Sequence, residues 1–252
     1  MTSSDFSGRV VLVTGGASGM GAASARRFAA AGATVVVLDR NADGAAAVAE
    51  EIGGSAPVVG DVSDSSFCAD AVQTVVDRHG RLDVLVNAAG TIHRADSLGT
   101  EDADWRRVMG VNVDGMFWLC RAALPHMIAA GKGAIVNFGS IWGGVGSAGS
   151  TAYCVSKGAV HQLTRALALD HVEQGIRVNA VAPGEVNTPM LASERATPPT
   201  PADLQALADA TIPMKRLADP DEIAAVVVFL ASDDASYMTG EIVHVDAGYT
   251  AR

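Results

Sequence analysis

Short β-branched and apolar runs alternate with alanine-rich helical stretches along the whole chain. The runs are continuously apolar, as in RVVLVT (9–14), TVVVLD (34–39) and IRVNAVAPG (176–184), which indicates strands buried on both faces. Such strands belong in a parallel sheet that is covered by helices and joined through right-handed crossovers. The pattern therefore predicts an α/β fold, a single doubly wound domain with a seven-stranded parallel sheet and helices on both faces. The predicted strands are 9–14, 34–39, 56–62, 82–90, 133–140, 176–184 and 241–248, and the predicted helices are 19–31, 44–52, 65–78, 101–130, 151–173 and 220–231.

Composition and charge narrow the class of protein. The 252 residues, 49% of them hydrophobic, are enough for one well-filled domain over 1–252. The net charge of −10 argues against nucleic acid and anionic membranes as partners. No apolar run approaches the roughly 18 residues of a membrane span, and no basic region precedes the first strand, so we expect neither a membrane helix nor a secretory signal. Three cysteines without a C-x-x-C spacing predict free thiols in the cytoplasm, and we assign no metal site.

One segment departs from the regular alternation. Residues 187–216 carry five prolines and lie between the sixth strand and the helix at 220–231. A long insertion at such a position is more typical of a mobile flap over a site than of a linker. We therefore predict a substrate flap at about 187–216.

Glycines and polar residues gather where the predicted strands end. Gly15, Gly19 and Gly21 follow the first strand at the mouth of a helix, where glycine lets the backbone approach a pyrophosphate and the helix terminus favours its charge. The spacing G-x-x-x-G-x-G differs from G-x-G-x-x-G, and a tight turn alone would also explain it. The second strand ends in Asp39, placed to bond an adenosine ribose, although a helix cap is the simpler reading of that residue alone. Because parallel strands end at one sheet edge, the set predicts a dinucleotide site (a Rossmann domain).

A tyrosine and a lysine lie four residues apart in TAYCVSKGAV (151–160). On a helix, Tyr153 and Lys157 share one face. For an isolated Y-x-x-x-K, the simpler interpretation is a half-buried tyrosine beside a surface lysine. Cys154 is interpreted as a small buried residue, because no histidine lies near it in sequence to activate it.

Seven motifs occur in a fixed order along essentially the whole chain. They are TGGASGMG (14–21), DV (61–62), NAAG (87–90), Asn112 in VMGVNVDGMF, Ser140 in VNFGS, YCVSK (153–157) and PGEVNTP (183–189). In this order they resemble the short-chain dehydrogenase/reductase family, with Ser140 placed 13 residues before Tyr153 as in that family. The departures are Gly110 two residues before Asn112, and NAAG where the family often has N-N-A-G. Neither removes a functional group.

The resemblance implies four catalytic residues and a cofactor site. Tyr153 would be the general acid/base, with a pKa lowered from about 10 by the ammonium of Lys157 and by the oxidised nicotinamide ring. Lys157 would also bond the nicotinamide ribose. Ser140 would hold the substrate oxygen, and Asn112 would bend its helix and hold a water that links Lys157 to solvent. The implied cofactor-binding residues are Gly15, Ser18, Gly19, Met20, Gly21, Asp39, Arg40, Asp61, Val62, Asn87, Ala88, Ala89, Gly90, Tyr153, Lys157, Pro183, Gly184, Val186 and Thr188.

The resemblance implies reversible hydride transfer between NAD(H) and a small secondary alcohol or its ketone, of the sugar, polyol or cyclic type. The candidate substrate contacts are Ser140, Trp142, Glu185, His93 and Met190, with Arg94 and Arg195 near them in sequence. Glu185 would receive hydroxyls, and His93 and Arg94 would meet an anionic substrate unless they form a solvated loop. A 3-oxoacyl thioester reductase is the alternative enzyme. A non-catalytic NAD-binding regulator is the alternative of another class, and the presence of all four catalytic residues argues against it.

Two further expectations concern cofactor choice and assembly. Asp39 predicts NAD rather than NADP, because a carboxylate beside the ribose repels a 2′-phosphate. Arg40 opposes this, but Ser18 and Met20 in the glycine loop supply no second cation. Family members commonly pair the helix at 151–173 and the long helix before it across two-fold axes, and the last strand across another, so the resemblance implies a homotetramer, with a dimer as second choice.

Overall fold

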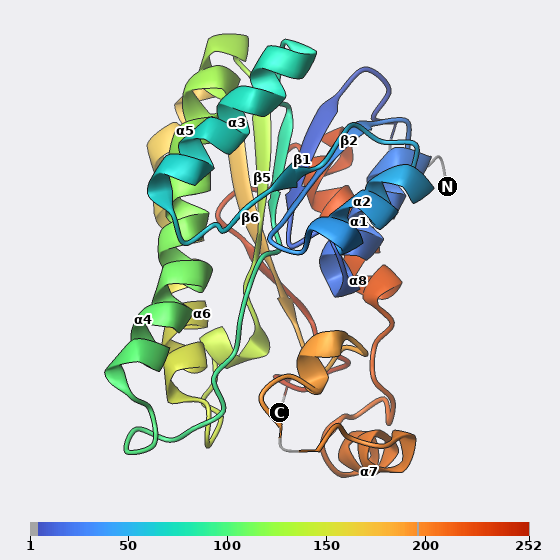
Figure 1. Ribbon diagram of the computed structural model, residues 1–252, viewed down its shortest axis with the longest axis vertical. Coiled ribbons are helices and arrows are strands. Elements are labelled where there is room, and N and C mark those ends of the chain that lie inside the picture. The colour runs from blue at the N-terminus through green and yellow to red at the C-terminus, as the bar shows by residue number, and fades with distance from the viewer. Residues whose placement is uncertain (1–4, 196, 252) are drawn as a thin grey trace.

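The computed structural model describes residues 5–195 and 197–251 and shows one sheet between two layers of helices (Figure 1). Within these residues, seven parallel strands pair in the order β3-β2-β1-β4-β5-β6-β7, which confirms the predicted doubly wound sheet. The strands are β1 (Val10–Thr14), β2 (Thr34–Asp39), β3 (Val58–Val59), β4 (Val84–Asn87), β5 (Gly133–Phe138), β6 (Ile176–Pro183) and β7 (Ile242–Val245). The helices are α1 (Gly19–Ala30), α2 (Ala42–Glu51), α3 (Ser65–His79), α4 (Asp102–Met109), α5 (Gly115–Ala130), α6 (Thr151–His171), α7 (Pro201–Thr211) and α8 (Pro220–Ala231).

Each face of the sheet has its own apolar core. Alternate residues of a strand point to opposite faces, so Leu12 of β1 packs in the cluster beneath α3 and α5. Val11 and Val13 of the same strand pack in the cluster beneath α1 and α8. Figure 1 shows α3, α4, α5 and α6 on one side of the sheet and α1, α2 and α8 on the other. Two buried faces explain why the strands read as unbroken apolar runs.

Several predicted boundaries differ from the structure because polar side chains turn the chain early. The third strand was expected over 56–62 but pairs only at Val58–Val59, since Asp61 accepts hydrogen bonds from the amide and hydroxyl of Ser63 and turns the backbone. The last strand was expected over 241–248 but ends at Val245. There Asp246 accepts bonds from the amides of Gly248 and Thr250.

The predicted helix at 101–130 is interrupted. A π turn over Gly110–Asp114 separates α4 from α5, and Asn112 lies in its middle. π turns insert one extra residue into a helix and occur often at functional sites. The helix that the resemblance expected Asn112 to bend is therefore locally widened at that residue.

The predicted flap contains regular structure. It holds a 3₁₀ turn at Pro189–Leu191 and helix α7, which begins with a capping box between Thr200 and Asp203. In Figure 1, α7 lies beyond the lower end of the sheet, apart from the two helix layers. Ala196, within the predicted flap, lies outside the described residues. Among the described helices, none combines the length and apolarity needed to cross a bilayer.

Candidate active site

The glycine loop packs directly on the loop that follows β4. Gly15 has a φ of 63°, and a Cβ at this position would lie 2.7 Å from the Cα of Ala89. A Cβ on Gly21 would collide with the carbonyl oxygen of Gly15. The N-terminus of α1 thus lies at the switch point between β1 and β4, where glycines keep the backbone of the turn accessible. This cradle fits a dinucleotide pyrophosphate.

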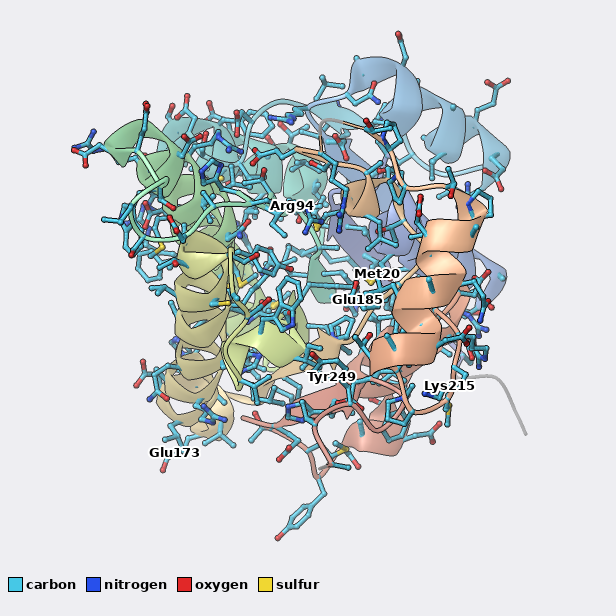
Figure 2. All side chains as sticks on the ribbon, turned by 90° about the horizontal axis from the view of Figure 1, so that it is seen from below. Met20, Arg94, Glu173, Glu185, Lys215 and Tyr249 are labelled. Carbon is cyan, nitrogen blue, oxygen red and sulfur yellow. The ribbon has the colours of Figure 1, made fainter. Side chains whose placement is uncertain are left out.

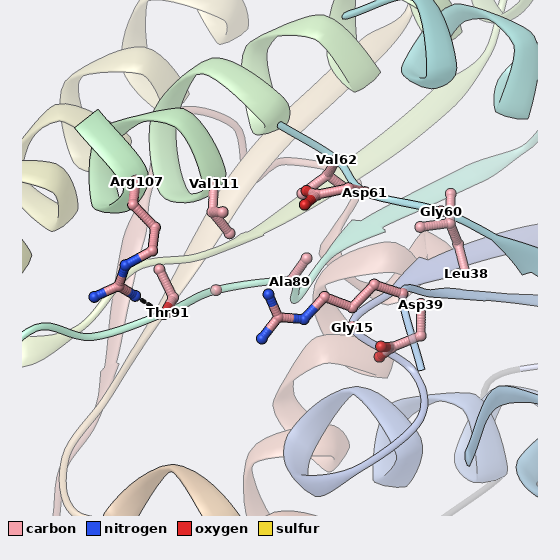
Figure 3. Close-up of a pocket in the computed structure, with 12 residues that line it drawn as sticks. Gly15, Leu38, Asp39, Gly60, Asp61, Val62, Ala89, Thr91, Arg107 and Val111 are labelled. Carbon is pink, nitrogen blue, oxygen red and sulfur yellow. Dashed lines mark hydrogen bonds between the residues drawn. The ribbon is translucent and has the colours of Figure 1, made fainter. Parts of the chain in front are cut away.

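A cavity runs along the ends of β1 to β4, and we call it the strand-end cavity (Figure 3). Asp39 is fixed in its wall because its two carboxylate oxygens accept bonds from the amides of Ala17, at 3.0 Å, and Asn41, at 2.9 Å. The carboxylate is therefore held in place by backbone and stays half-exposed to the cavity. The lining comprises Gly15, Leu38, Asp39, Arg40, Gly60, Asp61, Val62, Ala89, Gly90, Thr91, Arg107 and Val111.

Five residues of the strand-end cavity were not predicted, namely Leu38, Gly60, Thr91, Arg107 and Val111. Arg107 donates to the Thr91 hydroxyl at 3.0 Å (Figure 3). It also donates to the carboxylates of Asp104, at 3.1 Å, and Glu194, at 2.6 Å. Arg107 and Val111 lie four residues apart just before Asn112, so their helical spacing was the signal that they share a face with the site.

A second cavity surrounds Tyr153, and we call it the Tyr153 cavity. The rings of Tyr153 and Trp142 meet edge to face, with centroids 5.9 Å apart. Lys157 lies below, with Nζ 5.5 Å from the centre of the Tyr153 ring and donating to the carbonyl of Phe138 at 2.7 Å. The lining is Met20, Ile92, Arg94, Gly139, Ser140, Ile141, Trp142, Tyr153, Pro183, Gly184, Glu185, Val186, Thr188, Met190 and Leu191.

Burial controls the pKa values of the two reactive side chains. It raises the pKa of Tyr153 to about 12, with Glu185 adding to the rise and a hydrogen bond with Ser140 and the charge of Arg94 opposing it. Burial also lowers the pKa of Lys157 to about 8. The predicted lowering of the tyrosine pKa is not seen among the protein's own groups, because desolvation of the phenolate outweighs the opposing effects of Ser140 and Arg94.

Asn112 ties the loop after β4 to helix α6. Its amide oxygen accepts from the Thr91 amide at 2.8 Å, and its amide nitrogen donates to the Thr91 carbonyl and to the Ser156 hydroxyl, both at 2.9 Å. Ser156 in turn donates to the carbonyl of Tyr153 at 2.8 Å. Asn112 therefore fixes the helix turn that carries the tyrosine, and the water implied for it stays a prediction.

A buried histidine supports the turn that carries Ser140. His161 is 4% exposed and packs between Gly139 and Gly143, where a Cβ on Gly143 would lie 2.7 Å from its Cε1. Burial lowers the pKa of His161 to about 4, against a hydrogen bond to the Ser140 backbone, so the ring is neutral at ordinary pH. The sequence signal was its position, one helical turn beyond Lys157.

Eight predicted site residues are in the lining of neither cavity, namely Ser18, Gly19, Gly21, Asn87, Ala88, His93, Asn112 and Lys157. The side chain of Asn87 is buried in the sheet, where it donates to Asn137 at 2.9 Å and to Cys120 at 3.3 Å. His93 faces the flap instead of the Tyr153 cavity, with its Nδ1 2.9 Å from the Glu194 carboxylate. Cys154 is half-buried, and its thiol lies 3.8 Å from the carbonyl of Ser147.

A dinucleotide cradle at the switch point, beside a buried tyrosine, lysine and serine, defines a nicotinamide-dependent oxidoreductase with a Rossmann fold. A family model described as enoyl-(acyl carrier protein) reductase matches residues 15–250. The chain belongs to the short-chain dehydrogenase/reductase family, and it is an oxidoreductase that acts on alcohols with a nicotinamide cofactor.

Curated relatives and solved structures match over the full length. The chain is 45% identical to a galactitol 2-dehydrogenase (L-tagatose-forming) of Cereibacter sphaeroides, over 96% of this chain and 95% of the relative. It is 45% identical to a cis-4-hydroxycyclohexanecarboxylate dehydrogenase of Sinomonas cyclohexanicum, over 98% of both chains. A proposed NAD(P)-dependent gluconate 5-dehydrogenase of Beutenbergia cavernae, solved with NADP at low occupancy, superposes with a TM-score of 0.90 at 40% identity, over 98% of this chain and 99% of the other.

Proposed function

We propose that the protein is an NAD-dependent dehydrogenase of small secondary alcohols of the sugar, polyol or cyclic type, working reversibly. The observation that carries this proposal is the Tyr153 cavity, where the phenol, the Ser140 hydroxyl and the strand-end loop 183–188 line one space above Lys157. The relatives that act on galactitol and on a hydroxylated cyclohexane support the substrate class. When bound, the nicotinamide supplies the hydride acceptor or donor.

The protein's own groups hold the substrate oxygen and move its proton. Ser140 is fixed by the Trp142 amide, which donates to its hydroxyl oxygen at 3.2 Å, so its proton is directed to an acceptor such as a substrate oxygen or the phenol. Tyr153 takes the alcohol proton during oxidation and returns it during reduction. Its high pKa keeps the phenol protonated at neutral pH, so the proton is in place for reduction. A positive charge beside it, from Lys157 or a bound nicotinamide, favours the phenolate in oxidation.

The cofactor residues fit NAD by position and charge. Asp39 stands at the end of β2 with a fixed carboxylate that can accept bonds from ribose hydroxyls. Arg40 lines the same cavity, and the structure adds Arg107 as a second cation. Arg107 is already paired with two carboxylates, so it is poorly placed to neutralise a 2′-phosphate. We therefore propose NAD over NADP.

A turnover screen tests the function. Secondary alcohols from the polyol, sugar and cyclic classes are offered with NAD and with NADP, and reduced nicotinamide is followed by absorbance. We expect turnover of at least one class with NAD and its loss in Tyr153→Phe. A purified, folded, NAD-binding protein that turns over none of them would overturn the proposal.

A 3-oxoacyl thioester reductase is the second candidate, favoured by the acyl-carrier description of the matching family model. It would reduce acetoacetyl thioesters with NADPH faster than it oxidises any alcohol in the screen. A non-catalytic NAD-binding regulator would bind NAD and turn over neither kind of substrate. The same assay therefore separates the three hypotheses.

We also propose a cytoplasmic homotetramer. Phe117 of α5 and Val155 and Leu169 of α6 are 39%, 44% and 77% exposed, which leaves apolar surface on the helices expected to pair. Cys68 and Cys120 are buried free thiols, as expected in a reducing compartment. Light scattering at micromolar protein should give the mass of a tetramer, and a monomer would contradict the assembly.

A further inference from the structure

The Tyr153 cavity holds a guanidinium that has no carboxylate partner. Arg94 lines the cavity and is half-buried, and in the described part of the chain it forms no ion pair. Its neighbour Arg107 differs, because that guanidinium contacts both Asp104 and Glu194. A buried cation without a counter-charge is costly, so its place beside the reactive tyrosine needs an explanation.

The hydrogen bonds of Arg94 fix its position but leave its charge unneutralised. Nε donates to the carbonyl of Ser193 at 3.1 Å and Nη2 to the carbonyl of Met190 at 3.3 Å. Both acceptors belong to the flap and are uncharged. Among the described residues Nη1 has no hydrogen-bond partner, so the guanidinium keeps donor capacity toward the cavity.

Arg94 and Glu185 are the charged side chains in the lining of the Tyr153 cavity. Burial lowers the pKa of Arg94 and the charge of Arg195 lowers it further, while Glu185, Tyr153 and Glu194 act in the opposite sense. Burial raises the pKa of Glu185, and the two arginines oppose that rise. Glu185 thus acts on Arg94 at a distance, and in the described part of the chain no ion pair joins the two side chains, so the guanidinium stays open to a ligand carboxylate. Figure 2 shows Arg94, Glu185 and Met20 near one another between α6 and α7.

We propose that Arg94 is a carboxylate-binding residue and that the preferred substrates are secondary alcohols carrying a carboxylate, such as hydroxylated cyclohexane acids or sugar acids. An arginine binds a carboxylate through parallel N–H donors, and a substrate anion supplies the counter-charge that the protein withholds. Glu185 accepts hydrogen bonds from substrate hydroxyls, and its negative charge lowers the affinity for the anion. This inference rests on the proposed alcohol dehydrogenase function and adds the substrate's charge to it.

A binding experiment tests the charge without requiring turnover. Cyclohexanecarboxylate and cyclohexanecarboxamide have nearly the same shape and differ in charge, and neither can be oxidised at an alcohol. Each is titrated calorimetrically into protein saturated with NAD. We expect the carboxylate to bind at least about tenfold more tightly than the amide, as for a charge-assisted contact.

Three variants identify the residue responsible. Arg94→Met keeps the apolar stem and should bring the affinity ratio to about one. Glu185→Gln removes the opposing carboxylate and should widen the ratio. Arg195→Met is the matched control, because it removes an exposed cation that does not line the cavity and should change the ratio by less than about threefold. Loss of the hydrogen bonds to the flap weakens the binding of both probes equally, so the test uses only the ratio of their affinities.

The second measurement is kcat/KM for gluconate and for glucitol with NAD. We expect the ratio of these two values to change across wild type and the three variants as the affinity ratio does. A wild-type affinity ratio of carboxylate to amide near one, or a ratio unchanged by Arg94→Met, would overturn the inference. Turnover of neutral alcohols in the same experiment would leave the proposed function intact. A carboxylate preference in binding without turnover of any alcohol would leave Arg94 as the anion site and refute the dehydrogenase function instead.

Discussion

The sharpest test of the cofactor site is Asp39→Asn, which removes one negative charge and keeps the side chain's shape. Asp39 is held by the amides of Ala17 and Asn41, and the amide oxygen of asparagine can still accept one of these bonds. The variant therefore changes the electrostatics of the strand-end cavity with little change in its structure.

The expected magnitude follows from the exposure of Asp39. Two unit charges 4 Å apart repel by about 1 kcal/mol in water and about 4 kcal/mol near a protein surface. Asp39 is half-exposed, so we take the lower part of that range for a 2′-phosphate, about 1.4 to 3 kcal/mol. This corresponds to a wild-type preference for NAD over NADP of about 10- to 160-fold in kcat/KM.

The assay measures kcat/KM for both cofactors with one substrate in three proteins. Wild type should prefer NAD, and Asp39→Asn should lose most of that preference because Arg40 then faces the phosphate without an opposing charge. Asp43→Asn is the matched control, since it removes an exposed charge in the first turn of α2, outside the cavity. A wild type that prefers NADP, or an Asp39→Asn ratio equal to that of wild type, would refute the reasoning.

The remaining predictions concern catalysis and the cradle. Tyr153→Phe should abolish most turnover and leave the Kd for NAD nearly unchanged in a fluorescence titration; near-normal turnover would remove Tyr153 from the mechanism. Because burial raises the pKa of Tyr153, the phenol is protonated at pH 7, so kcat/KM for oxidation should rise from pH 7 to 10, and a steady fall would contradict a phenolate base. Gly21→Ala should weaken NAD binding at least about tenfold, because its Cβ meets the Gly15 carbonyl, whereas Gly146→Ala, where a Cβ meets open space, should not.

The fold was predictable because burial dictates it. Seven unbroken apolar runs allow few arrangements other than a parallel sheet covered on both faces. Each of these runs contains one of the seven paired strands. The ends were less predictable, because they depend on local polar bonds. Asp61 and Asp246 both end strands early by capturing the amides that follow them, which no apolar pattern records.

The candidate site was predictable where it follows strand ends and less so where distant segments meet. Asp39, Ser140 and Tyr153 follow from motif and spacing, and the structure brings each to the wall of a cavity. Arg107 and Glu194 are 87 residues apart, and only the folded chain brings them together. The direction of the Tyr153 pKa was also missed, because the depth of burial cannot be read from a neighbouring lysine four residues away.

The π turn at Gly110–Asp114 sets the rotational phase of α4 relative to α5. Each residue advances an α-helix by about 100°, so deleting one residue here would restore regular helix and rotate α4 on its axis by about that angle. Arg107 would then swing away from Thr91 and Glu194, although no side chain of the cavity had been replaced. The extra residue therefore sets the angle by which α4 is rotated relative to α5. Helix α5 packs on the core, whereas α4 carries Arg107 toward the cofactor crevice and the flap. Length changes in this short stretch should therefore affect the site more than most substitutions within it.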